Sequence, residues 1–508
     1  MLFTYILALG ISCIVALVVA SGLLRRRVYP LPLPPGPRPL PILGNALQLD
    51  TKRPWLTYTA WGKTYGKIIH SRVLGIDFII INSETIAREL LDKRSANYSS
   101  RPVIPTNKLS GLDFGTLFLP YGETLRRHRK IYHQVLRAEV SVSYHEMYSR
   151  HANELVINLL GTTSDPWQQT EAYTASLIMT VTYGYLAHGH EDLFFNPRTR
   201  TPSYWANKLV LQRGLPCSQP FLSVSASVDD IIFNIQHQVA VEKLPFWCFG
   251  GGFALMGRST ELAQQLLNEP FDEVKAQIAD GTASHSLVAD FLSQAHDDAD
   301  EETMKAVALM AYIAGIDTTT ATLRIFLLAM VLYPDVQARA RRPLPYLDAV
   351  LLEALRWYPI GPLGVPHATL NDDVYDGYFI PKGAMVMVNQ WALSRDEDIY
   401  PDASRFDPSR HLTIDGKLKD HFVSHLAFGH GRRICPGRWF AENSLWTAVS
   451  AILAVLHIDH AKDSNGDKIE VKPQFGTGLV VHPEPFHCSF VGVNTAREGH
   501  LREMMKSK

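Results

Sequence analysis

The chain has 508 residues, enough for one large enzyme domain or for two or three ordinary ones. Apolar residues make up 46% and charged residues 19%, a composition that buries a large core and excludes a disordered or fibrous protein. The formal net charge of −1 gives no electrostatic reason to expect a nucleic-acid partner. The five cysteines are scattered without CxxC spacing, which argues against a disulfide framework or a zinc cluster and favours a reducing compartment.

An uncharged, mostly apolar run extends from Leu2 to Leu24. As a helix it would be ~35 Å long, enough to cross a bilayer core of ~30 Å. Arg25 to Arg27 follow at once, and basic residues mark the cytoplasmic end of a membrane span. We therefore expect residues 2–24 to be a single-pass anchor with the rest of the chain in the cytosol. The alternative is a cleaved signal peptide, which the small residues Ala20 to Gly22 favour and the lack of a preceding positive charge disfavours.

Residues 25–41 form a basic and proline-rich linker. It carries seven prolines in the twelve residues from Pro30 to Pro41. Such a segment can form neither a helix nor a central strand, and it favours an extended, stiff spacer. The folded catalytic domain should then occupy residues 42–508.

Helical periodicity dominates the body of the chain. Helices are predicted over Leu125–Leu136, His151–Leu160, Thr303–Leu332 and Tyr346–Trp357. A β-hairpin is predicted from Lys67–Val73 and Phe78–Ile81, turning at Gly75–Asp77, and a second β-rich patch spans Val374–Val388. The predicted fold class is mainly α with a small β-rich side.

The strongest chemical signal is the segment Phe428–Gly437, with the sequence FGHGRRICPG. A thiolate is a strong, soft ligand for iron, and its charge needs stabilisation. Pro436 suits the first position of a helix, which would place Cys435 beside free backbone N–H groups. Gly431 and Gly437 allow a tight turn and close backbone approach to a flat ligand. The alternative is a buried structural cysteine in a glycine-rich turn, but the spacing F-x-x-G-x-R-x-C-x-G is met at every fixed position.

At these residues the chain resembles the cytochrome P-450 family of haem-thiolate monooxygenases, with Cys435 as the axial ligand of the haem iron. Three further motifs follow the family's order: AGIDTT at Ala314–Thr319, EALR at Glu353–Arg356 and FDPSRH at Phe406–His411. The resemblance covers roughly Pro34 to Phe490 and is close to microsomal fungal members. It implies the cytochrome P-450 fold, preceded here by one N-terminal transmembrane helix.

The Ala314 motif lies inside a long apolar helix. Gly315 lacks a side chain, so that the helix could pass close to the haem and to oxygen. Polar Asp317 and Thr318 in such a helix need an explanation, because buried polar groups without partners are costly. One explanation is a hydrogen bond from the threonine hydroxyl to the helix backbone. The resemblance implies another, in which Thr318 hydrogen-bonds dioxygen and Asp317 relays protons as the catalytic pair.

The resemblance also implies which residues hold haem b. The propionates would bind Arg129, His367 and Arg433. The remaining cofactor-binding residues would be Ala314, Gly315, Phe428, Gly431 and Gly437. Glu353, Arg356 and Arg410 would form a buried structural triad, although an E-x-x-R pair taken alone is usually a surface ion pair.

The implied activity is insertion of one oxygen atom of O2 into an apolar or amphipathic small molecule, in secondary metabolism or xenobiotic turnover. Electrons would come from NADPH through a separate NADPH–cytochrome reductase at the endoplasmic reticulum membrane, because nothing in the chain resembles a fused flavin domain. The reductase is expected on a basic face formed by Arg126, Arg127, Lys130, Arg432 and Arg438. The substrate pocket is expected to be lined by Val103–Pro120, residues 186–240, Ala308–Thr318, Ile360–Val365 and Gly476–Val480.

Two other functions are compatible with a haem-thiolate site. A haem-thiolate isomerase or dehydratase needs no reductase, but it has less use for a proton-delivering Asp317–Thr318 pair. A haem-binding protein without catalysis, either a sensor or an inactive remnant, belongs to a different class. The chain also departs from the family pattern: Leu125 stands where a tryptophan is usual, and Ser409 and His411 replace the usual Glu and Phe.

Overall fold

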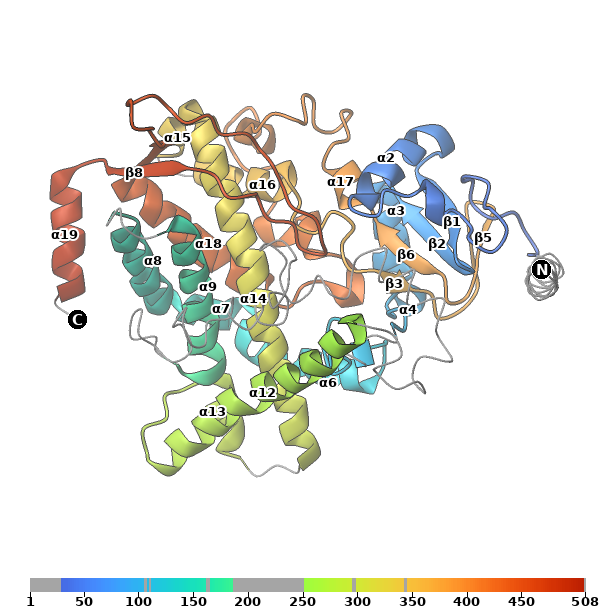
Figure 1. Ribbon diagram of the computed structural model, residues 1–508, viewed down its shortest axis with the longest axis horizontal. Helices are drawn as coiled ribbons and strands as arrows, with labels where there is room; N and C mark the ends of the chain where they lie inside the picture. Colours follow the sequence, from blue (N-terminus) through green and yellow to red (C-terminus); the bar gives the residue numbers. More distant parts are fainter. Residues whose placement is uncertain are drawn as a thin grey trace, which may run out of the picture.

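The computed structural model describes residues 29–104, 107–108, 111–160, 165–185, 251–294, 298–341 and 345–506. The predicted anchor at residues 2–24 and the predicted pocket segment 186–240 lie outside the described residues. Figure 1 shows the β-sheet at one end of the long axis, the helices in the middle and the C-terminal helix at the other end.

Helices make up most of the described chain. They are α2 (Pro54–Tyr65), α3 (Glu84–Ala87), α4 (Ser95–Tyr98), α6 (Glu123–Leu136), α7 (Ala138–Ser143), α8 (His145–Leu160), α9 (Pro166–Tyr183), α12 (Gly251–Ala279), α13 (Leu287–Leu292), α14 (Asp298–Leu332), α15 (Pro334–Ala340), α16 (Tyr346–Trp357), α17 (Gln390–Leu393), α18 (Arg438–Val455) and α19 (Thr495–Lys506). A π-helical turn, Arg88–Lys93, continues α3. The mainly α class is therefore confirmed, and the N-terminal span stays a prediction.

Helix α14 runs through the centre of the molecule (Figure 1). It packs along α9 and also contacts α6, α16 and α18. Among the described residues it is the one helix long and apolar enough to cross a membrane, with a mean hydropathy of 1.4 over the best window. Because 72% of that window is buried, α14 is a helix of the protein core.

The main sheet has the strand order β1-β2-β6-β3, with β1 (Ile68–Val73), β2 (Ile76–Ile81), β6 (Met385–Val388) and β3 (His367–Ala368). β1 and β2 form the predicted hairpin, and β2 runs parallel to β6. The predicted turn position was wrong: the turn is Leu74–Gly75, whose φ values of 49° and 87° give the left-handed geometry that suits a two-residue hairpin loop. Smaller sheets pair β4 (Asp373–Tyr375) with β5 (Tyr378–Ile380) and β7 (Leu456–His460) with β8 (Cys488–Gly492).

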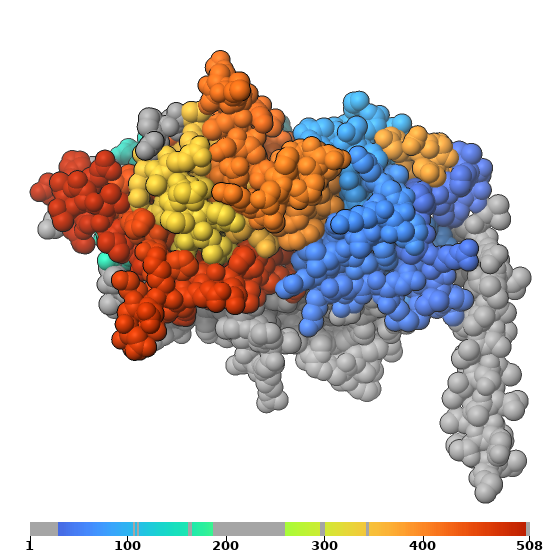
Figure 2. All heavy atoms as spheres, turned by 90° about the horizontal axis from the view of Figure 1, so that it is seen from above, coloured from blue at the N-terminus to red at the C-terminus, as the bar shows by residue number. Residues whose placement is uncertain are grey.

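The run Phe78–Ile81 of strand β2 is apolar without alternation because both faces of the sheet are covered there. Ile79 and Ile81 pack against the residues of α3, the π-helical turn and α4. Phe78 and Ile80 pack on the other face against Tyr58 of α2. In Figure 2 the blue N-terminal part adjoins orange segments from later in the chain, which reflects the pairing of β2 with β6.

The proline-rich segment is attached to this sheet. The His70 N–H donates to the Pro35 carbonyl over 3.0 Å, and the Phe379 N–H donates to the Pro32 carbonyl over 2.8 Å. A Cβ at Gly36 would lie 1.9 Å from the His70 carbonyl oxygen, so only glycine permits this contact. The extended backbone of the predicted linker is thus held against the catalytic domain.

Candidate active site

Cys435 lies in a loop that precedes α18. The Cys435 N–H donates to the Phe428 carbonyl over 2.8 Å and closes this loop. Helix α18 begins at Arg438 with Gly437 as its N-cap, so the prediction that Pro436 opens the helix was wrong. The Gly437 N–H nevertheless opposes the effect of burial on the pKa of the Cys435 thiol, and a backbone N–H beside the sulfur is the kind of donor that an anionic ligand requires.

Two cations flank the sulfur. The Arg129 Nη1 donates to the Ile434 carbonyl over 2.9 Å, and the Arg438 Nη1 donates to the Cys435 carbonyl over 3.1 Å. Burial raises the pKa of the Cys435 thiol, while the Gly437 N–H, Arg129 and Arg438 oppose that rise. A thiol in these surroundings loses its proton when a metal cation binds, because the cation stabilises the thiolate.

The glycines of the loop serve contacts within the protein. Gly431 has φ 54°, and a Cβ there would lie 2.1 Å from the Leu91 carbonyl oxygen. Its N–H donates to Asp92 Oδ1 over 2.5 Å. Gly431 therefore permits a close approach to the π-helical turn, and its predicted approach to a flat ligand stays a prediction. Gly437 lies next to the sulfur, and its Cβ would be 3.9 Å from Cys435 Sγ.

A second group of cations consists of Arg433 of the loop and Arg101. Arg433 donates from Nε to the Ser99 carbonyl over 2.7 Å and from Nη2 to the Leu119 carbonyl over 2.6 Å. Arg101, which the sequence analysis missed, is 7% exposed and donates from Nη1 to the carbonyls of Val365 and Pro366. Arg101 thus contacts the segment that leads to His367, and the charges of Arg101 and Arg433 both act on His367.

These cations have no carboxylate partner among the described residues. Burial and the neighbouring Arg433 lower the pKa of Arg101, and burial and Arg129 lower that of Arg433 to about 10. Burial and the charge of Arg101 also lower the pKa of His367, whose Nδ1 hydrogen-bonds the Tyr98 carbonyl. Buried cations need anions, and a flat cofactor with two carboxylates next to Cys435 fits this arrangement. The residues present therefore fit haem.

The middle of α14 is less buried than the rest of this helix. Residues 311–315, 317 and 318 are only half-buried, whereas the helix on either side of them is mostly buried. The Thr318 hydroxyl donates to the Ala314 carbonyl over 2.7 Å, as one of the two explanations from the sequence required. Its oxygen lone pairs remain available as acceptors.

The space beside Gly315 faces helix α9. A Cβ at this position would lie 3.2 Å from Cγ1 of Ile178 on α9, which is closer than most side-chain contacts. The glycine therefore permits the tight packing of α14 on α9, and the approach of this helix to haem stays a prediction.

Asp317 has an unpredicted partner. Its Oδ1 lies 2.8 Å from His482 Nε2, across 165 residues of sequence. Its Oδ2 is buried and has no hydrogen-bond partner among the described residues. A buried carboxylate oxygen without a partner costs free energy, and such an exception marks Asp317 as a candidate functional residue.

An apolar wall lies beside this polar turn of α14. Around Ala321 and Val480 it gathers Leu117, Phe118, Ile313, Ile360 and Leu479. The structure thus brings together residues from four of the five segments predicted to line the substrate pocket, and the fifth, 186–240, is outside the described residues.

Behind the cysteine loop, Glu353, Arg356 and Arg410 meet. Arg356 donates from Nε and Nη2 to the two oxygens of Glu353, both over 2.7 Å, and Arg410 Nε lies 3.1 Å from Glu353 Oε1. His411 adds a fourth member, with Nε2 2.8 Å from Glu353 Oε2. Burial by itself would raise the pKa of Glu353, but hydrogen bonds from Arg356 and His411 lower it below the usual value.

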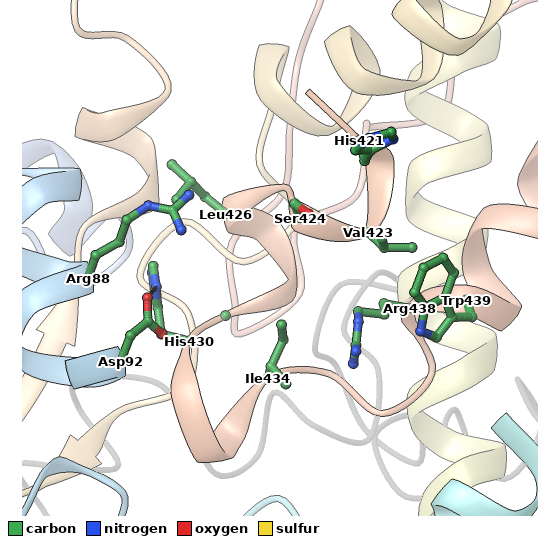
Figure 3. A pocket seen from close by; sticks show the side chains of 11 residues that line it. Arg88, Asp92, His421, Val423, Ser424, Leu426, His430, Ile434, Arg438 and Trp439 are labelled. Atoms are coloured by element: carbon green, nitrogen blue, oxygen red, sulfur yellow. Dashed lines mark ion pairs between the residues drawn. The ribbon is translucent and has the colours of Figure 1, made fainter. Parts of the chain in front are cut away.

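A separate pocket of about 500 Å³ lies beside the cysteine loop. It is lined by Arg88, Asp92, His421, Val423, Ser424, Leu426, Gly429, His430, Ile434, Arg438 and Trp439. Figure 3 shows His430 and Asp92 side by side, with Arg88 above them and Arg438 across the pocket. The pocket thus has basic side chains on two sides, and its carboxylate Asp92 is already engaged by the Gly431 N–H.

The comparisons with known proteins agree with this site. The family model described as Cytochrome P-450 matches residues 34–490. The chain is similar to the cytochrome P-450 monooxygenase COX1 of Coprinopsis cinerea, at 32% identity over 94% of this chain and 95% of that protein. It is also similar to the monooxygenase claR of Ampulloclitocybe clavipes, at 33% identity over 97% of this chain and 92% of that protein. With the thiolate loop and its cations in place, these matches show that the chain belongs to the cytochrome P-450 family of haem-thiolate monooxygenases.

Proposed function

We propose that this monooxygenase inserts one oxygen atom of O2 into an apolar or amphipathic small molecule at the endoplasmic reticulum membrane. The observation that carries the substrate class is the apolar wall around Ala321 and Val480, next to the polar turn at Asp317 and Thr318. An apolar wall with few polar groups is typical of sites for lipophilic ligands. Substrates of secondary metabolism and xenobiotics share this chemistry.

In this proposal Cys435 holds the haem iron, and Arg101, Arg129, Arg433 and His367 receive the propionates. When bound, the haem supplies the iron centre at which dioxygen is reduced and activated. Thr318 and Asp317 act on the protons. The Thr318 oxygen can accept a hydrogen bond in the site while its own O–H donates to the Ala314 carbonyl. The unpartnered Oδ2 of Asp317 can hold the proton that the reaction consumes.

We infer that a separate NADPH–cytochrome reductase delivers the electrons to the face that carries the cysteine loop. Arg126, Lys130 and Arg432 are exposed there, and Arg432 donates to the Tyr121 hydroxyl over 2.6 Å. Arg127 pairs with Asp300 of α14, so its charge is partly neutralised. A basic surface of this kind attracts an acidic protein and speeds its association. The neighbouring pocket with Arg88 and Arg438 offers a place for an acidic side chain of that partner.

The membrane location rests on the anchor predicted from the sequence and on the surface next to it. Leu31, Leu40, Ile42 and Leu47 are exposed, with Leu47 at 73%. Such exposed apolar residues close to a predicted span suit contact with lipid. The proposal predicts that deletion of residues 1–27 releases the protein from membranes only in part.

The proposal is tested with the carbon monoxide difference spectrum and with NADPH-driven turnover. The reduced protein should give the red-shifted band of a thiolate ligand, and Cys435→Ser should abolish it, because serine is a poor anionic donor to iron. With purified reductase, NADPH and a panel of lipophilic compounds, at least one compound should gain an oxygen atom. Lys130→Glu should slow NADPH oxidation, whereas Lys382→Glu, an exposed lysine in the β5–β6 turn, should not. A thiolate band in the Cys435→Ser protein would contradict the assignment.

A further inference from the structure

His482 belongs to a hairpin near the C-terminus. Phe475 and Pro483 form an antiparallel bridge, and the Gly476 N–H donates to the His482 carbonyl over 3.0 Å. The ring of Phe475 stacks on Tyr358, with 3.6 Å between ring centroids. The backbone that carries His482 is therefore fixed in the fold, and its imidazole reaches Asp317 of α14 from a defined position.

Arg324 determines which nitrogen of His482 carries the proton. Its Nη1 lies 3.4 Å from His482 Nδ1, and a guanidinium can only donate. His482 Nδ1 is therefore the acceptor of that contact, and the ring proton lies on Nε2. The Nε2–H therefore donates a hydrogen bond to Asp317 Oδ1.

Arg324 itself is held firmly. Its Nη2 donates to the Trp167 carbonyl over 2.7 Å, and its guanidinium lies 4.7 Å from the centre of the Trp167 ring. Its Nε donates to the Thr170 hydroxyl over 3.2 Å. Nη2 also lies 3.6 Å from Glu171 Oε2, and the Glu171 side chain is 29% exposed. Burial raises the pKa of Glu171 above its usual value, although the charges of Arg324 and His482 act to lower it.

The charged groups around His482 are thus Asp317 and Arg324 of α14 and Glu171 of α9, with Asp165 as a further charge near Arg324. Asp317 is the only one of them that hydrogen-bonds His482 Nε2 among the described residues. The hydrogen bond occupies Oδ1 and leaves Oδ2 free. The direction of the free oxygen is consequently set by the histidine.

We propose that His482 is a positioning residue for the oxygen chemistry: its Nε2–H fixes the Asp317 carboxylate so that the free oxygen is held ready to carry a proton. Arg324 supports this role by keeping the ring proton on Nε2. The inference rests on the proposed role of Asp317 in proton delivery. It assigns His482 no proton transfer of its own, and this distinguishes a positioning residue from a shuttle.

The test compares His482→Leu with His482→Gln in the holoenzyme with purified reductase, NADPH and 7-ethoxycoumarin as an apolar probe. Leucine removes the donor, whereas the glutamine amide can still donate to Asp317 but cannot change its protonation state. NADPH-driven product formation should fall about tenfold in His482→Leu, since loss of one hydrogen bond to a charged group changes an equilibrium by about that factor. His482→Gln should restore most of it.

A second oxidant separates proton delivery from damage to the site. Cumene hydroperoxide brings oxygen that is already reduced and protonated, so product formation with it should be the same in His482→Leu and the unsubstituted protein. The carbon monoxide spectrum and the melting temperature should also be unchanged, and the solvent deuterium isotope effect on the NADPH-driven reaction should rise. His482→Leu with full NADPH-driven activity would overturn the proposal. So would a His482→Gln protein as impaired as His482→Leu, which would indicate a shuttle.

Asp317→Asn tests the assumption that Asp317 delivers protons. If Asp317→Asn has no effect on NADPH-driven turnover, the proposed role of Asp317 fails, whatever His482 does. If Asp317→Asn is impaired and His482→Leu is not, only the present inference fails. If both act through one step, the double variant should be no slower than Asp317→Asn alone, because coupled residues are not additive.

Discussion

Glu353 and Asp317 both lie in polar networks that contain a histidine and an arginine, yet the two networks differ in how completely they are satisfied. Glu353 is 0% exposed, and both of its oxygens accept hydrogen bonds from side chains. The Asp317 side chain is 14% exposed, and one of its oxygens has no partner among the described residues. We call the Glu353 network closed, because every carboxylate oxygen has a partner, and the Asp317 network open. A closed network stabilises the fold, whereas an open one leaves a hydrogen-bond acceptor available for chemistry.

The largest expected loss of stability comes from removing the charge of Glu353. Glu353→Gln removes a charge that compensates Arg356 inside the core, and breaking a buried pair in this way costs about 3–5 kcal/mol of unfolding free energy. Urea unfolding of the holoprotein in detergent measures it. Glu470→Gln is the control, because that side chain is 75% exposed and its change should stay within about 0.5 kcal/mol. A loss below about 1 kcal/mol in Glu353→Gln would remove the distinction between the networks.

His411→Phe tests the member of the closed network that the family pattern does not contain. Phenylalanine has a suitable volume but no donor, so Glu353 Oε2 keeps only its hydrogen bond from Arg356. We expect a loss of about 1.5–3 kcal/mol, typical of a hydrogen bond to a charged group. The same substitution at exposed His421 should leave the urea midpoint unchanged. An equally stable His411→Phe protein would show that Arg356 and Arg410 suffice.

The closed network also predicts a dependence on pH. The pKa of Glu353 is lower in the folded protein than its usual value of 4.5, so its stabilising effect is present above that pH and is lost as the pH falls through the folded pKa. The unfolding free energy should therefore decrease below about pH 4.5, by at most ~1.4 kcal/mol per pH unit from this group. Glu353→Gln should show a shallower slope in the same range. Equal slopes in the two proteins would mean that another carboxylate dominates.

The smallest effect on stability is expected in the open network. Asp317→Asn keeps an oxygen to accept the His482 N–H and adds an amide to the unpartnered side, so the unfolding free energy should change by less than about 1 kcal/mol. The carbon monoxide spectrum should be unchanged as well. A destabilisation as large as that of Glu353→Gln would make Asp317 a structural residue like Glu353.

The sequence was sufficient for those features that depend on neighbours in the chain. The helix predicted over Tyr346–Trp357 has the same bounds as α16, because its apolar positions recur with helical period and Pro345 precedes it. The β1–β2 hairpin and the cysteine loop follow from short motifs. Other helices began earlier than predicted, such as α8 at His145 and α14 at Asp298, because polar first turns do not show the apolar period.

Partners that are far apart in the chain could not be predicted. His482 lies 165 residues from Asp317, and Arg101 reaches Val365 across 264 residues. Both are single polar residues in segments without a motif of their own, so only the folded chain gives them a role. His411 was noticed as a departure from the family pattern, but its contact with Glu353 depends on how the Pro408–His411 turn packs against α16.

The hairpin between Phe475 and Pro483 has a consequence for the evolution of this enzyme. Leu479 and Val480 contribute to the apolar wall, and His482 follows two residues later on the same short segment. Substitutions that adapt the wall to a new substrate therefore fall on the same short segment that carries the imidazole. Under the role proposed for His482, substrate selectivity and the share of NADPH electrons that reach the product are linked through this one segment.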